Sequence, residues 1–502
     1  MSGKPQTVWK PQTHWRKQTL GEILRQRSRE AEALVTRGGR FTYGDLLAKA
    51  EAAGGAMQAM GLQGGDRVGI LMGNDEKWLA LFYGAALIGA VTVPVNTRFK
   101  AAEIDFCLKQ SGCKALFYVE RFLDIDFGAM VRGIGFSPAV EVSAGLPSGP
   151  FKASAVEPED VLLIQFTSGT TAYPKGAMLT HDSMLRDAWA AGTRIGIRAE
   201  DRYFNCRPFF HVAGSTLSAL MALASGACLV TLPTFEPGAA LELMERERCT
   251  LLSGNDTIMQ MLMGHADFPR RKLCLRGGWA AAGPQTMRAV IEVLGAKHIC
   301  AAYGLSEASP NVVMSDWRDP EPLRVNGLAL PHPGVELRIA ADGEIQVRGW
   351  NVMKGYCNNP EANAKAFTSD GWLRTGDLGE LTADGRLRMI GRLKDVFRVG
   401  GENVAPAEVE EVLLAHPAVE TAQVVGVPDA RLGEVPCAYV TLKSNRSVTE
   451  AELIQWTKAR CANFRVPRYL RIVADFEAIG MTASGKVQKT KLREHALREF
   501  NL

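Results

Sequence analysis

The stretch TSGTTAYPKG, residues 167–176, combines hydroxyl side chains, glycines and a lysine, which is the chemistry of a loop that binds phosphate. It does not fit the Walker loop, in which a second glycine precedes a lysine and then a serine or threonine. Counted from Gly169, Pro174 occupies the second glycine position, and Gly176 follows Lys175. Pro174 also lacks the N–H group that such a loop directs at phosphate. Two interpretations remain: a surface turn, or a loop whose hydroxyls, N–H groups and lysine surround a polyphosphate.

Helix and strand patterns alternate on both sides of this loop. VLLIQFTSGT, residues 161–170, predicts a strand that ends in the loop, and HDSMLRDAWAAG, residues 181–192, predicts the helix after it. Earlier, Thr42 can cap a helix over residues 43–60, and DRVGILMG, residues 66–73, predicts a buried strand. This alternation predicts α/β layers with largely parallel sheets through the first three-quarters of the chain.

The pattern changes in the last third of the chain. Residues 341–349 and 382–392 each carry Asp-Gly between alternating side chains and predict β-hairpins. Beyond Lys394 the chain has the pattern of a small α+β unit. The predicted organisation is a large N-terminal domain of layered α/β subdomains plus a β-barrel-like subdomain (1–391), a hinge (392–396) and a small mobile α+β C-terminal domain (397–502).

Composition narrows the class of protein. A chain of 502 residues with 58 Lys and Arg against 54 Asp and Glu is nearly balanced in charge, and we expect no nucleic-acid partner. The ten cysteines are scattered without a Cys-x-x-Cys pair, which is typical of reduced thiols in the cytoplasm. The apolar run at residues 78–96 is interrupted by Gly84, Gly89 and Pro94, and predicts a buried helix and strand rather than an integral membrane segment.

The loop and several further segments, in the same order, resemble the adenylate-forming superfamily, which contains acyl-CoA synthetases, peptide-synthetase adenylation domains and luciferases. The resemblance runs from about Phe41 to Arg493. One such motif is a weak signal, whereas an ordered series is a strong one. The further segments are RPFFHVAG (207–214), AYGLSEAS (302–309), GWLRTGDLGEL (371–381), GRLKDVFRVGGENVAPAEVE (391–410) and MTASGKVQKTKLR (481–493).

The resemblance implies a two-step reaction that uses ATP, Mg²⁺ and CoA. A carboxylic acid attacks the α-phosphate of ATP to give acyl-AMP and pyrophosphate, and CoA then takes the acyl group and releases AMP. Because two anions meet in the first step, a cation is needed there, and Lys486 is implied in that role. Lys394 is implied as the hinge about which the C-terminal domain rotates between steps, and His211 as the gate of the acyl tunnel.

The resemblance also implies the residues that bind the nucleotide. Glu307 and Thr167 are expected at Mg²⁺, because hard oxygen ligands suit this cation. Tyr303 is expected to stack on adenine, Asp377 to accept the ribose hydroxyls, and Arg392 to bind ribose or phosphate. The other implied residues are Ser168, Gly169, Thr170, Thr171 and Lys175 in the phosphate loop, Ala281, Ala282 and Gly283 at adenine, Gly304 and Ser306 beside Tyr303, and Gly400 and Gly401 on the CoA side.

Several positions depart from the pattern of the superfamily. If position 172 needs a positive φ, its alanine costs about 1 kcal/mol, and Ala172→Gly is expected to raise ATP affinity or rate. An inactive nucleotide-binding protein is therefore an alternative, although Lys486, Glu307, Asp377 and Arg392 are retained. The departures are Ala172, Ala281 and Ala282 for glycine, Ser306 for threonine and Gly480 for proline.

The acyl pocket is expected to be lined from residues 211–218, 253–262 and 281–284. These segments are mostly small or apolar, and the second has no Arg or Lys to pair with another carboxylate, which favours a medium-chain fatty, alicyclic or aromatic acid. The alternatives are an acyl-AMP ligase that loads a carrier protein and a luciferase-like oxygenase. No carrier attachment site is visible in the sequence, which favours free CoA. Both a monomer and a homodimer stay open.

Overall fold

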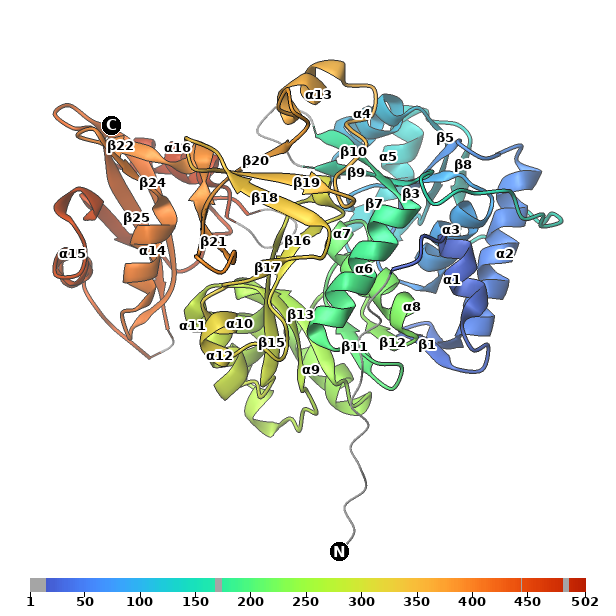
Figure 1. The fold of residues 1–502 in the computed structure, drawn as a ribbon, viewed down its shortest axis with the longest axis horizontal. Helices are drawn as coiled ribbons and strands as arrows, with labels where there is room; N and C mark the ends of the chain where they lie inside the picture. Colours follow the sequence, from blue (N-terminus) through green and yellow to red (C-terminus); the bar gives the residue numbers. More distant parts are fainter. Residues whose placement is uncertain (1–14, 168–173, 444, 482–486) are drawn as a thin grey trace, which may run out of the picture.

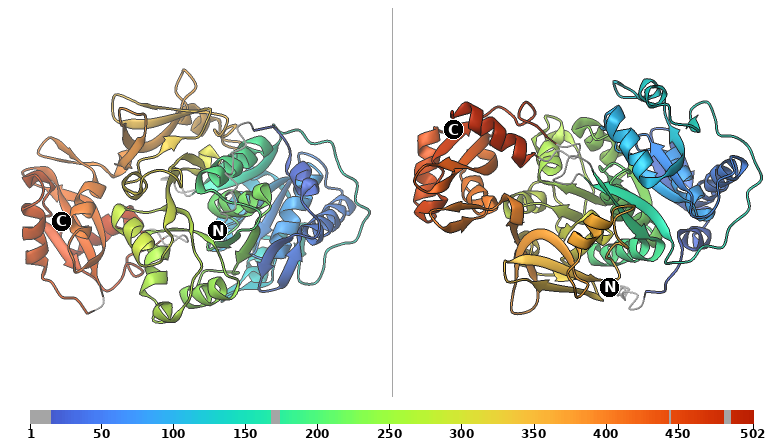
Figure 2. Two further views of the ribbon diagram at one scale, coloured as in Figure 1. Left: turned by 60° about the horizontal axis from the view of Figure 1, so that its bottom comes forward. Right: turned by 90° about the horizontal axis from the view of Figure 1, so that it is seen from above.

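The computed structural model describes residues 15–167, 174–443, 445–481 and 487–502, and shows a large N-terminal part with a smaller C-terminal part at one end of the long axis (Figure 1). Two further views keep the C-terminal part, orange to red, at that end (Figure 2). Some residues of the predicted site lie outside the described residues: Ser168, Gly169, Thr170, Thr171, Ala172 and Lys486.

The largest sheet has nine strands in the order β17-β16-β15-β14-β13-β11-β12-β1-β2. Its centre, from β15 to β1, is parallel, and both ends continue with antiparallel strands. The bounds are β1 Glu32–Thr36, β2 Gly39–Thr42, β11 Arg202–Asn205, β12 Cys228–Thr231, β13 Leu251–Asn255, β14 Gly277–Ala281, β15 His298–Gly304, β16 Asn311–Met314 and β17 Leu330–Pro331.

A second sheet has six strands in the order β10-β9-β4-β3-β5-β8, and all its pairs are parallel except β9 with β10. The predicted strand at residues 161–170 is β9, which ends at Thr167, and β10 begins at Lys175 on the far side of the phosphate loop. The bounds are β3 Arg67–Leu71, β4 Val91–Pro94, β5 Cys113–Tyr118, β8 Ala139–Glu141, β9 Val161–Thr167 and β10 Lys175–Thr180; the short pair is β6 Arg121–Phe122 and β7 Ile125–Asp126.

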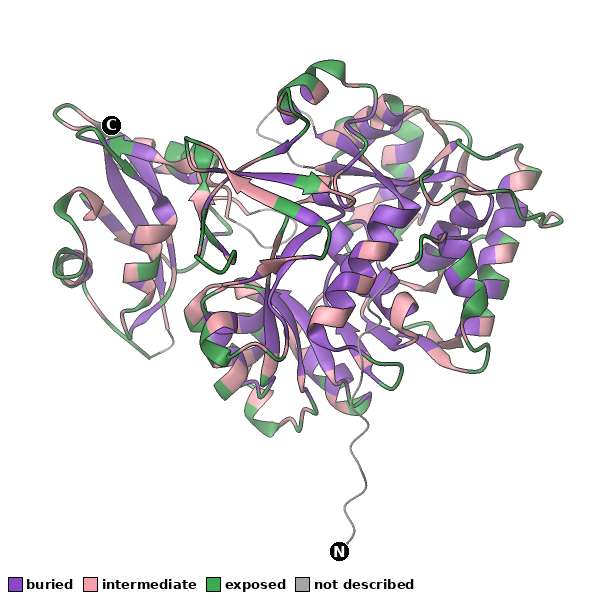
Figure 3. Ribbon diagram, viewed as in Figure 1, coloured by how far each residue is buried: buried purple, intermediate pink, exposed green. Residues whose placement is uncertain are grey.

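Helices cover both sheets, and α6 lies between them in contact with β10 on one side and β14, β15 and β16 on the other. Eleven of its residues are buried, and Figure 3 shows the helix mostly purple. The predicted cap of α2 forms, because Thr42 accepts an N–H group from the first turn, and Thr180 caps α6 in the same way. The bounds are α1 Leu20–Gln26, α2 Tyr43–Ala59, α3 Glu76–Leu87, α4 Ala101–Ser111, α5 Phe127–Ile134, α6 His181–Ile195, α7 Val212–Gly214, α8 Met221–Ser225, α9 Pro237–Arg246, α10 Asp256–Gly264, α11 Pro284–Glu292 and α12 Glu321–Val325.

The apolar run at residues 78–96 forms α3 and then β4, both buried, as the sequence predicts. In the part of the chain that the structure describes, no helix is both long enough and apolar enough to cross a membrane.

The two predicted hairpins form one four-stranded antiparallel sheet, in the order β18-β19-β20-β21, where the sequence predicts a barrel-like subdomain. It stands between the nine-stranded sheet and the C-terminal part (Figure 1). The bounds are β18 Val335–Ile339, β19 Glu344–Gly349, β20 Leu373–Leu381, β21 Leu387–Arg392 and α13 Pro360–Ala366, the helix between β19 and β20.

The C-terminal part is an α+β unit with its own core, formed where α14 and α16 cover the long β24–β25 pair. The helix after the Thr449 cap ends at Lys458, and a 3₁₀ turn follows at Asn463–Arg465, ahead of Pro467. The bounds are β22 Phe397–Val399, β23 Glu402–Val404, α14 Pro406–Leu414, β24 Val419–Asp429, β25 Gly433–Leu442, α15 Glu450–Lys458, β26 Tyr469–Ile472 and α16 Lys489–Glu499.

Candidate active site

The predicted nucleotide residues follow strand ends of both large sheets. Thr167 is the last residue of β9, Ala281 ends β14, and Gly304 ends β15. Carboxyl ends of neighbouring parallel strands meet at one edge of a sheet, where ligands bind in α/β proteins. Gly304 fits only as glycine, because an added Cβ would lie 2.0 Å from the carbonyl oxygen of Pro310. The fold therefore places Ala281 and Gly304 at a common edge of the nine-stranded sheet, and the Thr167 hydroxyl, 3.5 Å from Glu307 Oε1, brings the end of β9 near it.

Tyr303, Asp377 and Arg392 form the first group of contacts. The Tyr303 hydroxyl donates to Asp377 Oδ2 at 2.8 Å, and Arg392 Nε lies 3.1 Å from Asp377 Oδ1. Burial, and then the charge of Asp377, raises the pKa of Tyr303 well above its ordinary value, so the phenol keeps its proton and donates. Asp377 pairs with Arg392 across the β20–β21 hairpin, and its own side chain is 3% exposed. A carboxylate with two oxygens and four lone-pair sites can still accept further hydroxyls.

Glu307, Thr167, Tyr356 and Lys175 form the second group. The Tyr356 hydroxyl donates to Glu307 Oε1 at 2.8 Å, and the Thr167 hydroxyl lies 3.5 Å from the same oxygen. Lys175 Nζ lies 5.3 Å from the centre of the Tyr356 ring, within the range of a cation–π contact. Burial, and then the charge of Glu307, raises the pKa of Tyr356. Carboxylate and hydroxyl oxygens thus gather where the phosphate loop leaves β9 and enters β10.

A buried polar network joins the Tyr303 backbone to α6. Asn311 donates from its amide to the Tyr303 carbonyl at 3.3 Å, and its backbone N–H donates to Asp187 of α6 at 3.0 Å. His332 Nε2 lies 2.6 Å from the side-chain oxygen of Asn311. The Asn351 amide donates to the Asn311 carbonyl at 3.2 Å. Burial raises the pKa of Asp187 well above its ordinary value, which favours the neutral carboxyl in this network.

The adenine segment takes ordinary backbone angles. Neither Ala281 nor Ala282 has a positive φ, so the backbone at these two positions does not require glycine. The N–H of Gly283 donates to Asp256 at 3.0 Å, and Gly283 then caps α11. Ser306 and Glu307 lie in a 3₁₀ turn, Ser306–Ala308, that follows β15.

His211 caps a continuous buried helix, α7 to α8, whose middle turns, Ser215–Leu220, form a π-helix. Single π turns are frequent at functional sites. The His211 ring Nδ1 accepts the N–H of Ala213 at 3.1 Å. The residue is exposed, yet the protein crowded around the ring lowers the pKa of His211 to about 4, with a smaller contribution from Arg207. His211 is therefore neutral at pH 7, at the start of the predicted acyl segment.

Three further candidates follow the β20–β21 hairpin in the chain: Lys394, Gly400 and Gly401. Gly400 and Gly401 have positive φ, form the turn of the β22–β23 hairpin and are exposed. Lys394 is exposed in the 3₁₀ turn Leu393–Asp395 between β21 and β22. Within the described chain, no hydrogen bond or ion pair joins these three residues to the Tyr303 or Glu307 group. Lys486 is outside the described residues, between Met481 and Val487, which form an antiparallel bridge.

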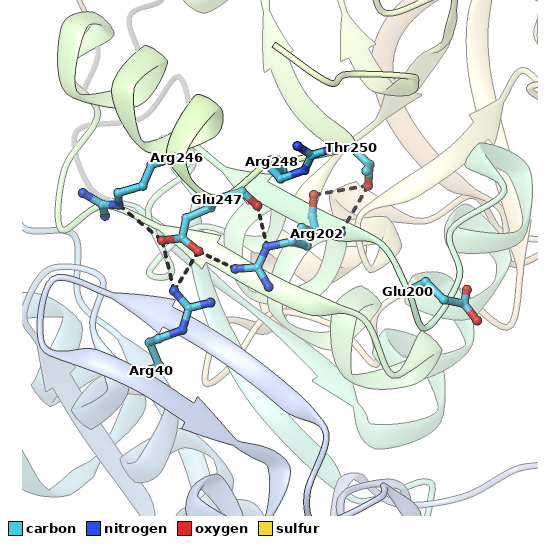
Figure 4. Close-up of a pocket in the computed structure, with 7 residues that line it drawn as sticks. All are labelled: Arg40, Glu200, Arg202, Arg246, Glu247, Arg248 and Thr250. Atoms are coloured by element: carbon cyan, nitrogen blue, oxygen red, sulfur yellow. Dashed lines mark hydrogen bonds and ion pairs between the residues drawn. The ribbon is translucent and has the colours of Figure 1, made fainter. Parts of the chain in front are cut away.

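A separate open depression of about 670 Å³ lies beyond the candidate site, at the β1–β2 edge of the nine-stranded sheet. Figure 4 shows Glu247 at its centre, bonded to Arg40, Arg202 and Arg246. Arg202 and Arg40 also pair with Glu32 of β1. Most of the positive charge is already matched by carboxylates, so we interpret this depression as a structural ion-pair network.

Sequence reasoning did not single out Tyr356 or Asn311. A tyrosine after glycine, or an asparagine after proline, has no chemical signal of its own. Their roles depend on contacts with Glu307 and Tyr303, which are 49 and 8 positions away in the chain.

Comparisons with known proteins show the family of the chain. Residues 22–357 match the AMP-binding enzymes, and residues 408–486 match the C-terminal domain of AMP-binding enzymes. The chain is 38% identical to the (7a-methyl-1,5-dioxo-octahydro-1H-inden-4-yl)propanoyl:CoA ligase of Mycobacterium tuberculosis, over 95% of this chain and 97% of that protein. It is 31% identical to the mitochondrial medium-chain acyl-CoA ligase ACSF2 of Bos taurus, over 96% of this chain and 88% of that protein.

A solved structure shows the same architecture. The anthranilate CoA ligase AuaEII in complex with anthranoyl-AMP superposes with a TM-score of 0.89 at 25% identity, over 97% of this chain and 98% of that chain. The chain therefore belongs to the AMP-binding enzyme family. The predictions of an adenylate-forming fold and of an AMP-forming acyl-CoA ligase that uses ATP and CoA are confirmed at this level.

Proposed function

We propose that this ligase activates a monocarboxylic acid with a nonpolar acyl group, either a medium-chain fatty acid or an alicyclic acid. The observation that carries the ligase chemistry is the gathering of Tyr303, Asp377 and Arg392, together with the contact of Glu307 with Thr167 at the end of β9. The substrate class is supported by the names of two relatives, a medium-chain acyl-CoA ligase and an alicyclic propanoyl:CoA ligase. An aromatic acid is the second candidate, since the anthranilate ligase has a similar fold.

In this proposal the two contact groups bind the two ends of ATP. Asp377 accepts the ribose hydroxyls and Arg392 supplies a fork of donors, while the Tyr303 ring stacks on adenine beside Ala281–Gly283. Lys175 and the loop hydroxyls bind the β- and γ-phosphates. The oxygens of Glu307 and Thr167 lie 3.5 Å apart and suit Mg²⁺. This cation usually binds one or two protein carboxylates together with phosphate oxygens of the substrate. Mg²⁺ would neutralise phosphate charge there.

The same proposal assigns residues to the second half-reaction. Lys394 is the hinge about which residues 397–502 rotate between the two half-reactions. The rotation removes Lys486 from the active site and brings the turn at Gly400 and Gly401 to the incoming CoA. The exposed single turn at Lys394 supports this assignment, because the chain enters the C-terminal sheet directly after it. His211, neutral and at the start of the acyl segment, is proposed as the gate.

The location and assembly are also proposals. We propose a cytoplasmic enzyme, a location that the ten free thiols support because a reducing compartment keeps cysteines unpaired. A homodimer is the assembly to test against a monomer by light scattering of the full chain.

Pyrophosphate release across a panel of acids, with and without CoA, tests the function. Octanoate and cyclohexanepropanoate should give pyrophosphate without CoA, and thioester only with it. Succinate should give neither, because the candidate acyl segments offer no partner for a second carboxylate. Release that needs no acid, or no release with any acid, would contradict the ligase. Acyl-AMP without thioester in the presence of CoA would favour loading of a carrier protein.

A further inference from the structure

Tyr356 lies between two elements of the candidate phosphate site, yet no motif in the sequence points to it. Its hydroxyl donates to Glu307 Oε1 at 2.8 Å, and the face of its ring lies 5.3 Å from Lys175 Nζ. Its side chain is buried, with the whole residue 8% exposed. One side chain therefore contacts both the carboxylate proposed for Mg²⁺ and the ammonium proposed for the phosphates.

The backbone of Tyr356 is fixed by β10. Residues 354–357 run antiparallel to this strand, with an isolated bridge between Tyr356 and Ala177. The N–H of Met178 donates to the Gly355 carbonyl at 2.9 Å, and the N–H of Cys357 donates to the Gly176 carbonyl at 2.8 Å. Because β10 begins at Lys175, this pairing fixes the position of Tyr356 relative to Lys175.

The first turn of α13 adds a clamp. Asn363 accepts the N–H of Tyr356 at 2.6 Å and donates to its carbonyl at 3.1 Å, so one amide holds both backbone groups. The preceding residue must be glycine, since Gly355 has a φ of +130° and a Cβ there would lie 3.0 Å from the Asn363 side chain. A tyrosine on a loose loop would not be held in this way.

The same segment also holds the backbone of Glu307. The N–H of Met353 donates to the Glu307 carbonyl at 2.8 Å. Glu307 is thus tied at its backbone by Met353 and at one carboxylate oxygen by Tyr356. A carboxylate held at Oε1 presents Oε2 in a restricted direction, whereas a free glutamate samples several rotamers.

We propose that Tyr356 is a positioning residue that directs the Glu307 carboxylate and the Lys175 ammonium toward the phosphates of ATP. The inference rests on the proposed function of Glu307 and Lys175. The hydroxyl sets the direction of the carboxylate, and the ring face restricts the ammonium. Preorganised charges of this kind favour binding and reaction because less ordering remains when the ligand arrives.

The test is a double-mutant cycle between Tyr356→Phe and Glu307→Gln, read by calorimetric binding of MgATP to the full chain without acid or CoA. Tyr356→Phe keeps the ring and removes the hydroxyl, and should weaken MgATP binding about tenfold, the size typical of a hydrogen bond to a charged group. In the Glu307→Gln background the same change should have little further effect, because the carboxylate that it directs is gone.

Two controls separate positioning from damage to the fold. Tyr118 lies in β5 of the six-stranded sheet to which β10 belongs and is also 8% exposed, and Tyr118→Phe should leave MgATP binding unchanged. Binding of ATP in the presence of EDTA should fall less in Tyr356→Phe than binding of MgATP does. Melting temperatures of all variants show whether each is folded.

Wild-type binding of MgATP in Tyr356→Phe would overturn the proposal, and so would an additive effect in the double variant. Failure of the proposed function would look different. In that case the wild-type chain itself would bind no MgATP and release no pyrophosphate with any acid.

Discussion

Asp377 accepts from Tyr303 and pairs with Arg392 although its own side chain is only 3% exposed. A buried carboxylate is costly unless it is bonded and paired, and here a phenol and a guanidinium meet both requirements. Arg392 is more exposed, with 42% of its side chain accessible, so its other donors can reach a ligand. At the residue scale, Asp377 is a carboxylate already fixed in position, and Arg392 is the cation beside it.

Asp377→Asn should weaken ATP binding by about tenfold to a hundredfold, because it removes the charge paired with Arg392 and replaces one acceptor oxygen by a donor. Calorimetric titration with MgATP measures the loss. Asp370→Asn is the matched control, because Asp370 is an exposed carboxylate paired with Arg338 and is not among the candidate site residues. Equal ATP affinity in wild type and Asp377→Asn would argue against a ribose role.

At the element scale, two connections matter most: the turn between β21 and β22, and the ion pairs that attach the β1–β2 hairpin. The turn Leu393–Asp395 is short and exposed, and strands of different sheets leave it on either side. The hairpin, by contrast, is joined to the loop after α9 by Arg40 and Glu247. The turn between β21 and β22 is therefore suited to movement, and the ion-paired β1–β2 hairpin to rigidity.

Lys394→Pro should permit acyl-AMP formation and block thioester formation. Proline fixes φ near −65°, so a hinge that must change this angle between half-reactions would be held in one state. Pyrophosphate release and CoA thioester are measured separately, with Lys394→Ala as the control that keeps both steps. Unchanged overall turnover in the proline variant would place the hinge elsewhere.

Glu247→Gln should lower the free energy of unfolding by about 1–3 kcal/mol, because it removes the carboxylate charge beside Arg202, Arg40 and Arg246, while Glu32 still pairs with the first two. Urea denaturation measures the change, and MgATP binding should stay at the wild-type value. The control is Glu336→Gln, since that exposed carboxylate pairs with Arg348 at the surface and should contribute less than about 1 kcal/mol. Equal effects of the two substitutions would contradict a structural role for the network.

At the scale of the whole molecule, buried titratable groups couple stability to pH. His181 of α6 is 1% exposed and its Nδ1 accepts the N–H of Leu20 at the start of α1, at 3.2 Å. Burial lowers the pKa of His181 to about 4, with a partial offset from Asp160 and Glu22. Burial also lowers the pKa of His332 to about 3. Both residues are neutral in the folded protein at pH 7, and protonation would replace an acceptor by a donor at His181.

His181→Asn should make the stability less sensitive to acid. Because the folded pKa lies below the unfolded value, His181 destabilises the fold as pH falls from about 6.5 to about 4, by about 2–3 kcal/mol in total. Carboxyls such as Asp75, whose pKa burial raises to about 6, have the opposite sign, so the difference between wild type and variant is the quantity to measure. Urea denaturation at pH 7 and pH 5 measures it. If wild type and His181→Asn lost the same free energy of unfolding between pH 7 and pH 5, the proposed role of His181 in acid sensitivity would be wrong.

The sequence by itself determined the types of element and the chemistry of the motifs. Threonine caps, Asp-Gly turns and apolar periods are local, because hydrogen bonds within one turn and burial of one face decide them, and α2, α6, β9 and both hairpins follow these patterns. The ordered motifs indicated the family without any coordinates.

Only the tertiary structure decided which side chains meet. Tyr303 contacts Asp377 across 74 positions, and Tyr356 contacts Glu307 across 49, because strand order and the path of the 354–357 segment along β10 bring them together. No local pattern encodes a pairing of that kind, since contacts between distant segments depend on how whole sheets and helices pack. The end of α15 at Lys458 and the open strand order of the four-stranded sheet were decided in the same way.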